Sequence, residues 1–234
     1  AMTNVFQFKQ FSVSQDKCAM KVGTDGVLLG AWANFNDGDV LDVGAGTGVV
    51  ALMAAQKNKN SQIDAIDVDS LAVNQSRVNF LNAPWKERLN VFHVALQDFF
   101  PGKQYDSIVS NPPFFNNTYR AKNKERNIAR HSELLTFEEL VKDVDRLLKN
   151  SGNFSVILPF PANEFEQLAA NHHLWVKTKT IVYPNLSRPP IRVLMEFVKQ
   201  KTKVVENKLT IEKLQRHYYT NEYKALTEDF YLNF

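Results

Sequence analysis

The segment Asp42–Gly48 combines residue types that could hold a small ligand against the backbone. Its sequence, D-V-G-A-G-T-G, follows an apolar run typical of a β-strand and precedes an apolar stripe typical of a helix. Glycines at such a strand end let the backbone turn sharply and approach a ligand that a Cβ atom would repel. A dinucleotide motif would need Gly or Ala at position 49, where the chain has Val49, and no P-loop motif occurs. The spacing therefore favours a nucleoside ligand that lacks a pyrophosphate.

Two carboxylates follow the next two predicted strands. Asp67 stands nineteen residues after Gly48, at a strand end where its oxygens can accept both hydroxyl hydrogens of a ribose. Its alternative role is to cap the following helix, a role that suits Asp69 better. Asp98 comes just past the third predicted strand, where it is placed to accept from an adenine amino group. These carboxylates extend the predicted nucleoside site across three neighbouring strands.

The tetrapeptide Asn111–Phe114, N-P-P-F, directly follows the fourth predicted strand. Consecutive prolines prevent the strand from continuing and fix an extended, rigid loop. In that loop the side-chain oxygen of Asn111 and the carbonyl of Pro112 can both accept from one planar amino group. Phe114 can stack on the ring that carries this group. A plain turn is the alternative reading, which the glycine-rich segment and Asp67 make the weaker one.

The elements that must position these residues alternate along the chain from about residue 39 onward. Apolar, β-branched runs predict strands at 40–43, 62–66, 89–94, 105–110, 153–158, 176–183 and 192–198. One helix is predicted directly after the glycine-rich segment, and a second near 71–81 with Ser70 as its N-cap. A third is predicted from a capping box at Thr136 through 148, with Gly152 as its stop, and a fourth near 163–171. The prediction is an α/β fold: a doubly wound, mostly parallel seven-stranded sheet, covered on both faces, whose last strand is antiparallel.

The composition fits one folded domain. The chain has 234 residues, 44% hydrophobic and 23% charged, which excludes disorder over most of its length. We expect a single domain over 1–234, with an N-terminal extension (1–38), a core (39–198) and a tail (199–234). The net charge of +3 neither demands nor excludes an anionic partner. No transmembrane run, secretory signal or metal-ligand spacing is present, so we expect a cytoplasmic protein without membrane or metal. The sequence does not give the oligomeric state, for which a monomer is favoured.

Together, Asp42–Gly48, Asp67, Asp98 and Asn111–Phe114 resemble the class I S-adenosylmethionine-dependent methyltransferases of the amino-methylating N-P-P-[FYW] type. The resemblance covers roughly residues 20–198. It implies a Rossmann-like fold with S-adenosyl-L-methionine as cofactor. It also implies catalytic roles for Asn111, Pro112 and Phe114, and a cofactor site formed by Thr24, Asp42, Gly44, Gly46, Asp67, Val68, Asp98 and Asn111.

The flanking segments are similar to those of the bacterial tRNA(Val) adenine-N6 methyltransferase family. These segments are Phe6–Phe11, Ala19–Trp32, Ser187–Leu194 and Asp229–Leu232. The resemblance implies methylation of the adenine directly 3′ of the anticodon (position 37) of tRNA(Val). Two alternatives share the N-P-P-F chemistry: guanine-N2 methylation of ribosomal RNA and N5 methylation of a protein glutamine. A non-catalytic cofactor-binding RNA module is a third, against which the intact tetrapeptide argues.

A basic stretch follows the tetrapeptide. Between residues 116 and 131 five cations stand against one acid, Glu125. We expect this stretch to bind RNA phosphates, and Tyr119 adds an aromatic ring to it. The alternative is a solvated loop. The predicted RNA-binding residues are Tyr119, Arg120, Lys122, Lys124, Arg126 and Arg130.

Overall fold

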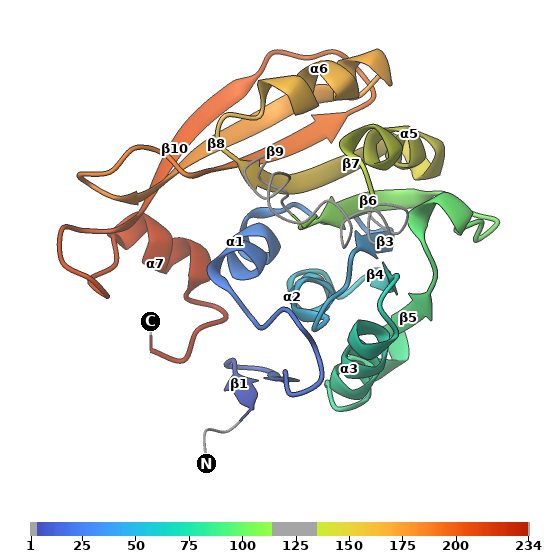
Figure 1. The fold of residues 1–234 in the computed structure, drawn as a ribbon, viewed down its shortest axis with the longest axis horizontal. Helices are drawn as coiled ribbons and strands as arrows, with labels where there is room; N and C mark the ends of the chain where they lie inside the picture. Colours follow the sequence, from blue (N-terminus) through green and yellow to red (C-terminus); the bar gives the residue numbers. More distant parts are fainter. Residues whose placement is uncertain (1–3, 114–134, 234) are drawn as a thin grey trace, which may run out of the picture.

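The computed structural model describes residues 4–113 and 135–233. Its centre is an eight-stranded sheet in the order β10-β8-β9-β7-β6-β3-β4-β5 (Figure 1). All pairs are parallel except those of β9, which is antiparallel to both β7 and β8. The strands are β3 (Gly38–Val43), β4 (Ser61–Asp67), β5 (Leu89–His93), β6 (Tyr105–Ser110), β7 (Leu148–Pro159), β8 (Trp175–Asn185), β9 (Arg192–Val198) and β10 (Val205–Glu212).

The seven predicted strands correspond to β3–β9, and the antiparallel return of the last of them is confirmed. The predicted count is too low by one, because the tail adds β10 to the edge of the sheet beside β8. The β10 sequence, V-E-N-K-L-T-I-E, has an exposed first half and a half-buried second half. Only Leu209 and Ile211 of this strand are buried, so the apolar pattern is too short to indicate a strand by itself.

Helices cover both faces of the sheet (Figure 1). One face carries α1 (Thr24–Trp32), α2 (Val49–Lys57), α3 (Ser70–Leu81) and α7 (Asn221–Thr227); the other carries α5 (Phe137–Leu147) and α6 (Asn163–Asn171). The buried side chains form two separate clusters, one on each face, as expected for a parallel sheet covered on both sides. Two 3₁₀ turns, η1 (Lys86–Arg88) and η2 (Leu96–Asp98), flank β5. Among the described residues, no helix combines the length and apolar character needed to cross a membrane.

The extension and the tail pack together on the α1–α2 side of the sheet. A small hairpin, β1 (Val5–Gln7) with β2 (Ser12–Ser14), presents Phe8, which is fully buried. The Phe8 ring stacks on Phe11 at 4.6 Å and on Tyr231 at 6.0 Å between centroids. The backbone N–H of Lys9 donates to the Phe230 carbonyl at 2.9 Å. Both ends of the described chain therefore share one apolar cluster with the core, and each buried ring contributes about 1.5–3 kcal/mol.

Most of the predicted helix boundaries are confirmed, but two of the predicted boundary residues, Ser70 and Gly152, are wrong. α6 has the predicted bounds, and α5 begins at the predicted capping box, in which Thr136 and Glu139 bond each other's backbone N–H groups. The N-cap of α3 is Asp69, whose carboxylate accepts from the Leu71 N–H; this confirms the capping role suggested for Asp69 and not the one suggested for Ser70. Gly152 lies within β7 and does not end a helix, because α5 already ends at Leu147 and the chain continues directly as a strand.

Candidate active site

The glycine-rich loop joins β3 to α2 in a conformation that requires glycine. Gly44 and Gly46 have φ angles of +82° and +55°, a region that residues with a Cβ atom rarely adopt. A Cβ atom added at either position would meet nothing within 4 Å, so both glycines border open space. At Gly48 (φ +85°), by contrast, a Cβ atom would lie 2.6 Å from the Phe80 ring. The first two glycines thus leave room for a ligand, and the third allows close packing against α3.

Asp67, the last residue of β4, holds the loop in place. Its Oδ2 accepts from the Gly46 N–H at 2.9 Å, and its Oδ1 accepts from the Asp69 N–H at 2.9 Å. The backbone N–H groups of Gly44 and Ala45 donate to the Ile66 carbonyl just before it. Each carboxylate oxygen has capacity for a second hydrogen bond. Asp67 can therefore position the loop and still accept hydroxyl hydrogens from a ligand.

Asp42 lies beneath the loop and is buried. One carboxylate oxygen accepts from the Ala51 N–H in the first turn of α2, and the other has no hydrogen-bond partner among the described residues. Burial, and secondarily the charge of Asp67, raises the pKa of Asp42 to about 8. At neutral pH this carboxyl group is therefore largely protonated. Its hydrogen bond is to the start of α2, and it is not part of the wall of the cavity that the loop borders.

The N-P-P segment begins where β6 ends, beside the glycine-rich loop. The Ser110 hydroxyl donates to the Val43 carbonyl at 2.9 Å, which ties the ends of β6 and β3 together. Asn111 follows and is half-buried. Its Nδ2 lies 3.9 Å from the position that a Cβ atom on Gly26 of α1 would take. The loop is thus placed between the end of the sheet and the first turn of α1.

A cavity of about 790 Å³ opens where the carboxyl ends of β3, β4 and β6 meet. Its volume falls within the range of small-molecule sites, and such sites form at this edge of doubly wound sheets. Its lining includes Gly44, Gly46 and Asp67 together with Asn111 and Pro112. Within the described residues, no three His, Cys, Asp or Glu side chains are grouped so as to hold a metal ion.

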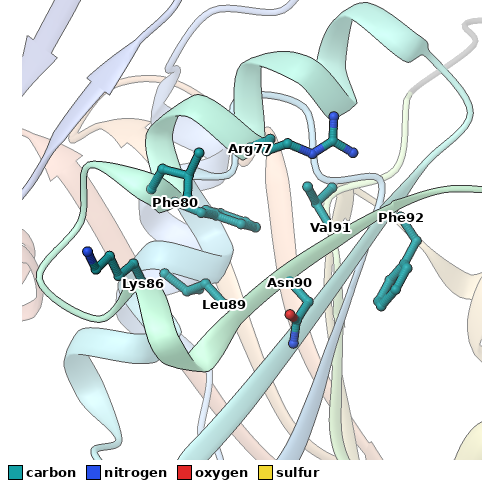
Figure 2. A pocket seen from close by; sticks show the side chains of 8 residues that line it. Arg77, Phe80, Lys86, Leu89, Asn90, Val91 and Phe92 are labelled. Carbon is teal, nitrogen blue, oxygen red and sulfur yellow. The ribbon is translucent and has the colours of Figure 1, made fainter.

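A second, smaller hollow of about 210 Å³ lies between α3 and β5 (Figure 2). Arg77 and Phe80 reach it from α3, and Asn90, Val91 and Phe92 from β5. None of the residues with predicted chemistry borders it. The larger cavity is therefore the candidate active site.

Comparisons with known proteins agree with this geometry. Residues 19–170 match the family described as the methyltransferase small domain. A tRNA1(Val) (adenine(37)-N6)-methyltransferase from Flavobacterium psychrophilum is 46% identical over 97% of this chain and 99% of its own length. A protein of the same name from Phocaeicola vulgatus is 45% identical over 97% of both chains. The chain belongs to the tRNA1(Val) (adenine(37)-N6)-methyltransferase family.

Solved structures confirm the fold of this methyltransferase. A predicted O-methyltransferase from Agrobacterium tumefaciens superposes with a TM-score of 0.66 at 16% identity, covering 88% of this chain and 96% of the other. The glycopeptide N-methyltransferase MtfA, solved in complex with S-adenosyl-L-methionine, gives a TM-score of 0.57 at 13% identity, covering 75% of this chain and 95% of the other. The class I methyltransferase architecture predicted from the sequence is therefore confirmed.

The structure brings most of the predicted cofactor residues of this methyltransferase to one cavity. Thr24, Gly44, Gly46, Asp67, Val68 and Asn111 border it, as does the predicted catalytic residue Pro112. Asp98 does not: it is exposed at the end of η2, and Leu96 and Gln97 of the same turn face the cavity instead. Phe114 and the predicted RNA-binding residues Tyr119, Arg120, Lys122, Lys124, Arg126 and Arg130 lie outside the described residues.

The cavity is also bordered by residues to which the sequence analysis assigned no individual role, although most of them lie in the segment Ala19–Trp32 that resembles the family. The segment 18–21 borders the cavity just before α1, and Asp25 and Gly26 border it from the first turn of that helix. α1 packs closely on α2, since a Cβ atom on Gly30 would lie 2.6 Å from the Met53 sulfur. Glycines at positions 26 and 30, four residues apart, could have indicated a helix with one small-residue face.

Proposed function

We propose that this protein transfers the methyl group of S-adenosyl-L-methionine to the N6 amino group of adenine 37 in tRNA(Val). The observation that carries the proposal is that Asn111 and Pro112 border the same cavity as Gly44, Gly46 and Asp67. One cavity thus combines an acceptor pair for an exocyclic amine with a nucleoside site. The names of the relatives at 46% and 45% identity supply the tRNA, the base and the position.

The residues present fit this cofactor. The open space over Gly44 and Gly46 admits a ligand close to the backbone, and Asp67 keeps acceptor capacity for ribose hydroxyls. Gln97, which also borders the cavity, would take the base-edge role that the sequence suggested for Asp98. Thr24, in the first turn of α1, suits a carboxylate because a helix N-terminus attracts negative charge. Asp42 would act indirectly, by joining the end of β3 to the first turn of α2 on either side of the loop.

The chain contributes mainly orientation. When bound, S-adenosyl-L-methionine supplies an electrophilic methyl group on a positively charged sulfur. The Asn111 side-chain oxygen and the Pro112 carbonyl would accept the two N–H hydrogens of the adenine amine and aim its nitrogen at that methyl group. Phe114 would stack on the extruded base. Holding both reactants in line accounts for most of the rate enhancement that such a site can provide.

The rival substrates have less support. Both relatives named above are tRNA1(Val) (adenine(37)-N6)-methyltransferases. Their names support neither a guanine of ribosomal RNA nor a glutamine of a protein as the substrate. A tRNA substrate also implies a cytoplasmic location, where tRNA is modified.

The test is methyl transfer to defined RNAs. Purified protein, labelled S-adenosyl-L-methionine and a tRNA(Val) transcript are incubated, and the nucleosides are identified by mass spectrometry. We expect N6-methyladenosine from this transcript and none when adenine 37 is replaced by guanine. Labelled N2-methylguanosine in ribosomal RNA, or label only in protein, would overturn the substrate assignment and leave the fold and cofactor in place.

A further inference from the structure

The carboxyl edge of the sheet extends well beyond the candidate active site. From Asn111, after β6, the sheet order leads along this edge past the end of β7 and the start of β9 to the ends of β8 and β10. Arg192, the first residue of β9, pairs with Pro159 of β7 and binds the Asp25 carboxylate at 3.0 Å beside the cavity. Four strand spacings separate β6 from β10, which is roughly 19 Å.

Two turns project from the far end of this edge. The first follows β8 and is built by Asn185, whose Oδ1 accepts from the backbone N–H groups of Ser187 and Arg188 at 3.0 and 3.1 Å. An Asx-type turn of this kind fixes the backbone and points its remaining side chains to solvent. Leu186 and Arg188 are both exposed on it.

The second turn follows β10 and is also well ordered by hydrogen bonds. Glu212 Oε1 accepts from the His217 N–H at 3.0 Å, and the Lys213 N–H donates to the Tyr218 carbonyl at 2.7 Å. All residues from 213 to 218 are exposed. Because Glu212 pairs with Asn185 in the sheet, the two turns adjoin, and Figure 1 shows them at the same end of the sheet.

The two turns carry cations without acids. The segments 185–192 and 213–218 contain no Asp or Glu. The charged groups of Arg188, Lys213 and Arg216 make no ion pair with any part of the chain that the structure describes. An apolar and an aromatic side chain are exposed on the same turn as Lys213 and Arg216: Leu214 is 74% exposed and Tyr218 58%. Exposed cations next to an exposed aromatic ring are typical of surfaces that bind RNA backbone and bases.

We infer that these two turns form a docking surface for the phosphate backbone of the RNA substrate, at the far end of the edge that starts at Asn111. This two-turn surface comprises Leu186, Arg188, Lys213, Leu214, Arg216 and Tyr218. The inference rests on the proposed function and specifies a second place, outside the active site, at which the RNA substrate is held. An adenine in the active site would leave phosphates of the same RNA within reach of the turns, about 19 Å away. RNA is thus bound at two separated places, which fixes its direction across the site.

The lysines of the tail do not form this surface. Lys199 and Lys201 follow β9, and Lys203 precedes β10, at the amino edge of the sheet. Lys199 pairs with Asp145 at 3.1 Å, and the Lys201 ammonium lies over the Trp175 ring. This edge faces away from the active site, so its lysines provide a matched control.

The test compares two triple variants of the full-length protein. Arg188→Gln/Lys213→Gln/Arg216→Gln removes three cations from the two-turn surface, and Lys59→Gln/Lys201→Gln/Lys203→Gln removes three exposed cations from the amino edge. Dissociation constants for the tRNA(Val) transcript are measured from low to physiological salt. We expect the slope of log Kd against log salt to fall by about 2–3 for the first variant and to stay at the wild-type value for the second.

Turnover separates docking from chemistry. For the first variant we expect a KM for tRNA at least tenfold higher, with an unchanged kcat at saturating tRNA and an unchanged Kd for S-adenosyl-L-methionine. Equal salt slopes for the two variants would overturn the proposal that the two-turn surface binds RNA. In that case, methylation of adenine 37 by the wild type would still support the proposed function. Absence of wild-type methylation in the same assay would instead overturn the proposed function itself.

Discussion

The Arg192 guanidinium contacts the Asp25 carboxylate at 3.0 Å, and this ion pair joins β9, which runs antiparallel to both of its neighbours in the sheet, to the first turn of α1. Both side chains are 28% exposed, so solvent screens the pair only in part. Asp25 borders the active-site cavity, and Arg192 lies at the edge that leads to the two-turn surface. The pair therefore connects the two places that the substrate is proposed to contact.

A double-mutant cycle measures this connection. Asp25→Ala and Arg192→Ala should each lower the free energy of unfolding. The loss in the double variant should be smaller than the sum of the two single losses by about 0.5–1 kcal/mol. Urea unfolding of all four proteins gives the coupling. Strict additivity would show that the contact contributes nothing to stability.

Asn111→Ala should remove methyl transfer and retain cofactor binding. One of two acceptors that orient the amine is lost, and misorientation at a reacting centre lowers the rate by about 10²-fold or more. Single-turnover assays report the rate, and calorimetry reports the affinity for S-adenosyl-L-methionine. Asn171→Ala, at the exposed end of α6, is the control and should behave as the wild type. A variant at position 111 with most of its activity would exclude the proposed role.

Gly44→Ala should weaken cofactor binding beyond its effect on stability. At φ +82° an added Cβ atom costs about 1–2 kcal/mol in backbone strain and occupies the space above the loop. Gly102→Ala is a matched control, because Gly102 has φ +71°, borders open space and is not part of the cavity wall. We expect similar losses in thermal stability for both variants and a raised Kd for S-adenosyl-L-methionine only for Gly44→Ala. Equal Kd values would contradict the proposed position of the cofactor.

Asp42→Asn should change how stability depends on pH. The pKa of Asp42 is about 8 in the folded protein, owing to burial and then to Asp67, and about 3.9 in an unfolded chain. Between these values the folded state keeps a proton that the unfolded state releases, so this group's stabilising contribution declines as the pH rises towards 8. The stability of the wild type relative to Asp42→Asn should therefore fall from pH 5 to pH 8. Chemical unfolding at four pH values checks this; a constant difference would refute it.

The sequence predicted the core of the fold because its signals are local. The strand at 105–110 and the helix at 163–171 carry their own apolar runs and were predicted with the correct bounds. α1 was missed because residues 26–31 are all buried, so the helix has no polar face and no amphipathic period. β10 was missed for the opposite reason, since its first half is exposed and its pairing with β8 is decided by tertiary contacts.

The candidate site was predicted wherever a motif follows a strand end. The glycine-rich loop, Asp67 and Asn111 could be placed because the carboxyl ends of parallel strands meet at one edge. The position of Asp98 could not be predicted in this way. Asp98 and Gln97 are neighbours in a 3₁₀ turn, and the sequence does not indicate which of them borders the cavity. Asp25 lies in the segment Ala19–Trp32 that resembles the family, but its position at the cavity depends on a helix that the apolar pattern does not indicate.

The position of β10 also has a consequence for solubility. Without it, β8 would be an outer strand, and Thr180, Ile181 and Val182 would lie on an unpaired backbone ladder. An outer strand rich in β-branched residues is a template for pairing with other chains. β10 replaces it with a strand bearing Glu206 and Lys208, whose exposed charges oppose such pairing. The same tail that presents one RNA-binding turn therefore protects the sheet from aggregation between copies.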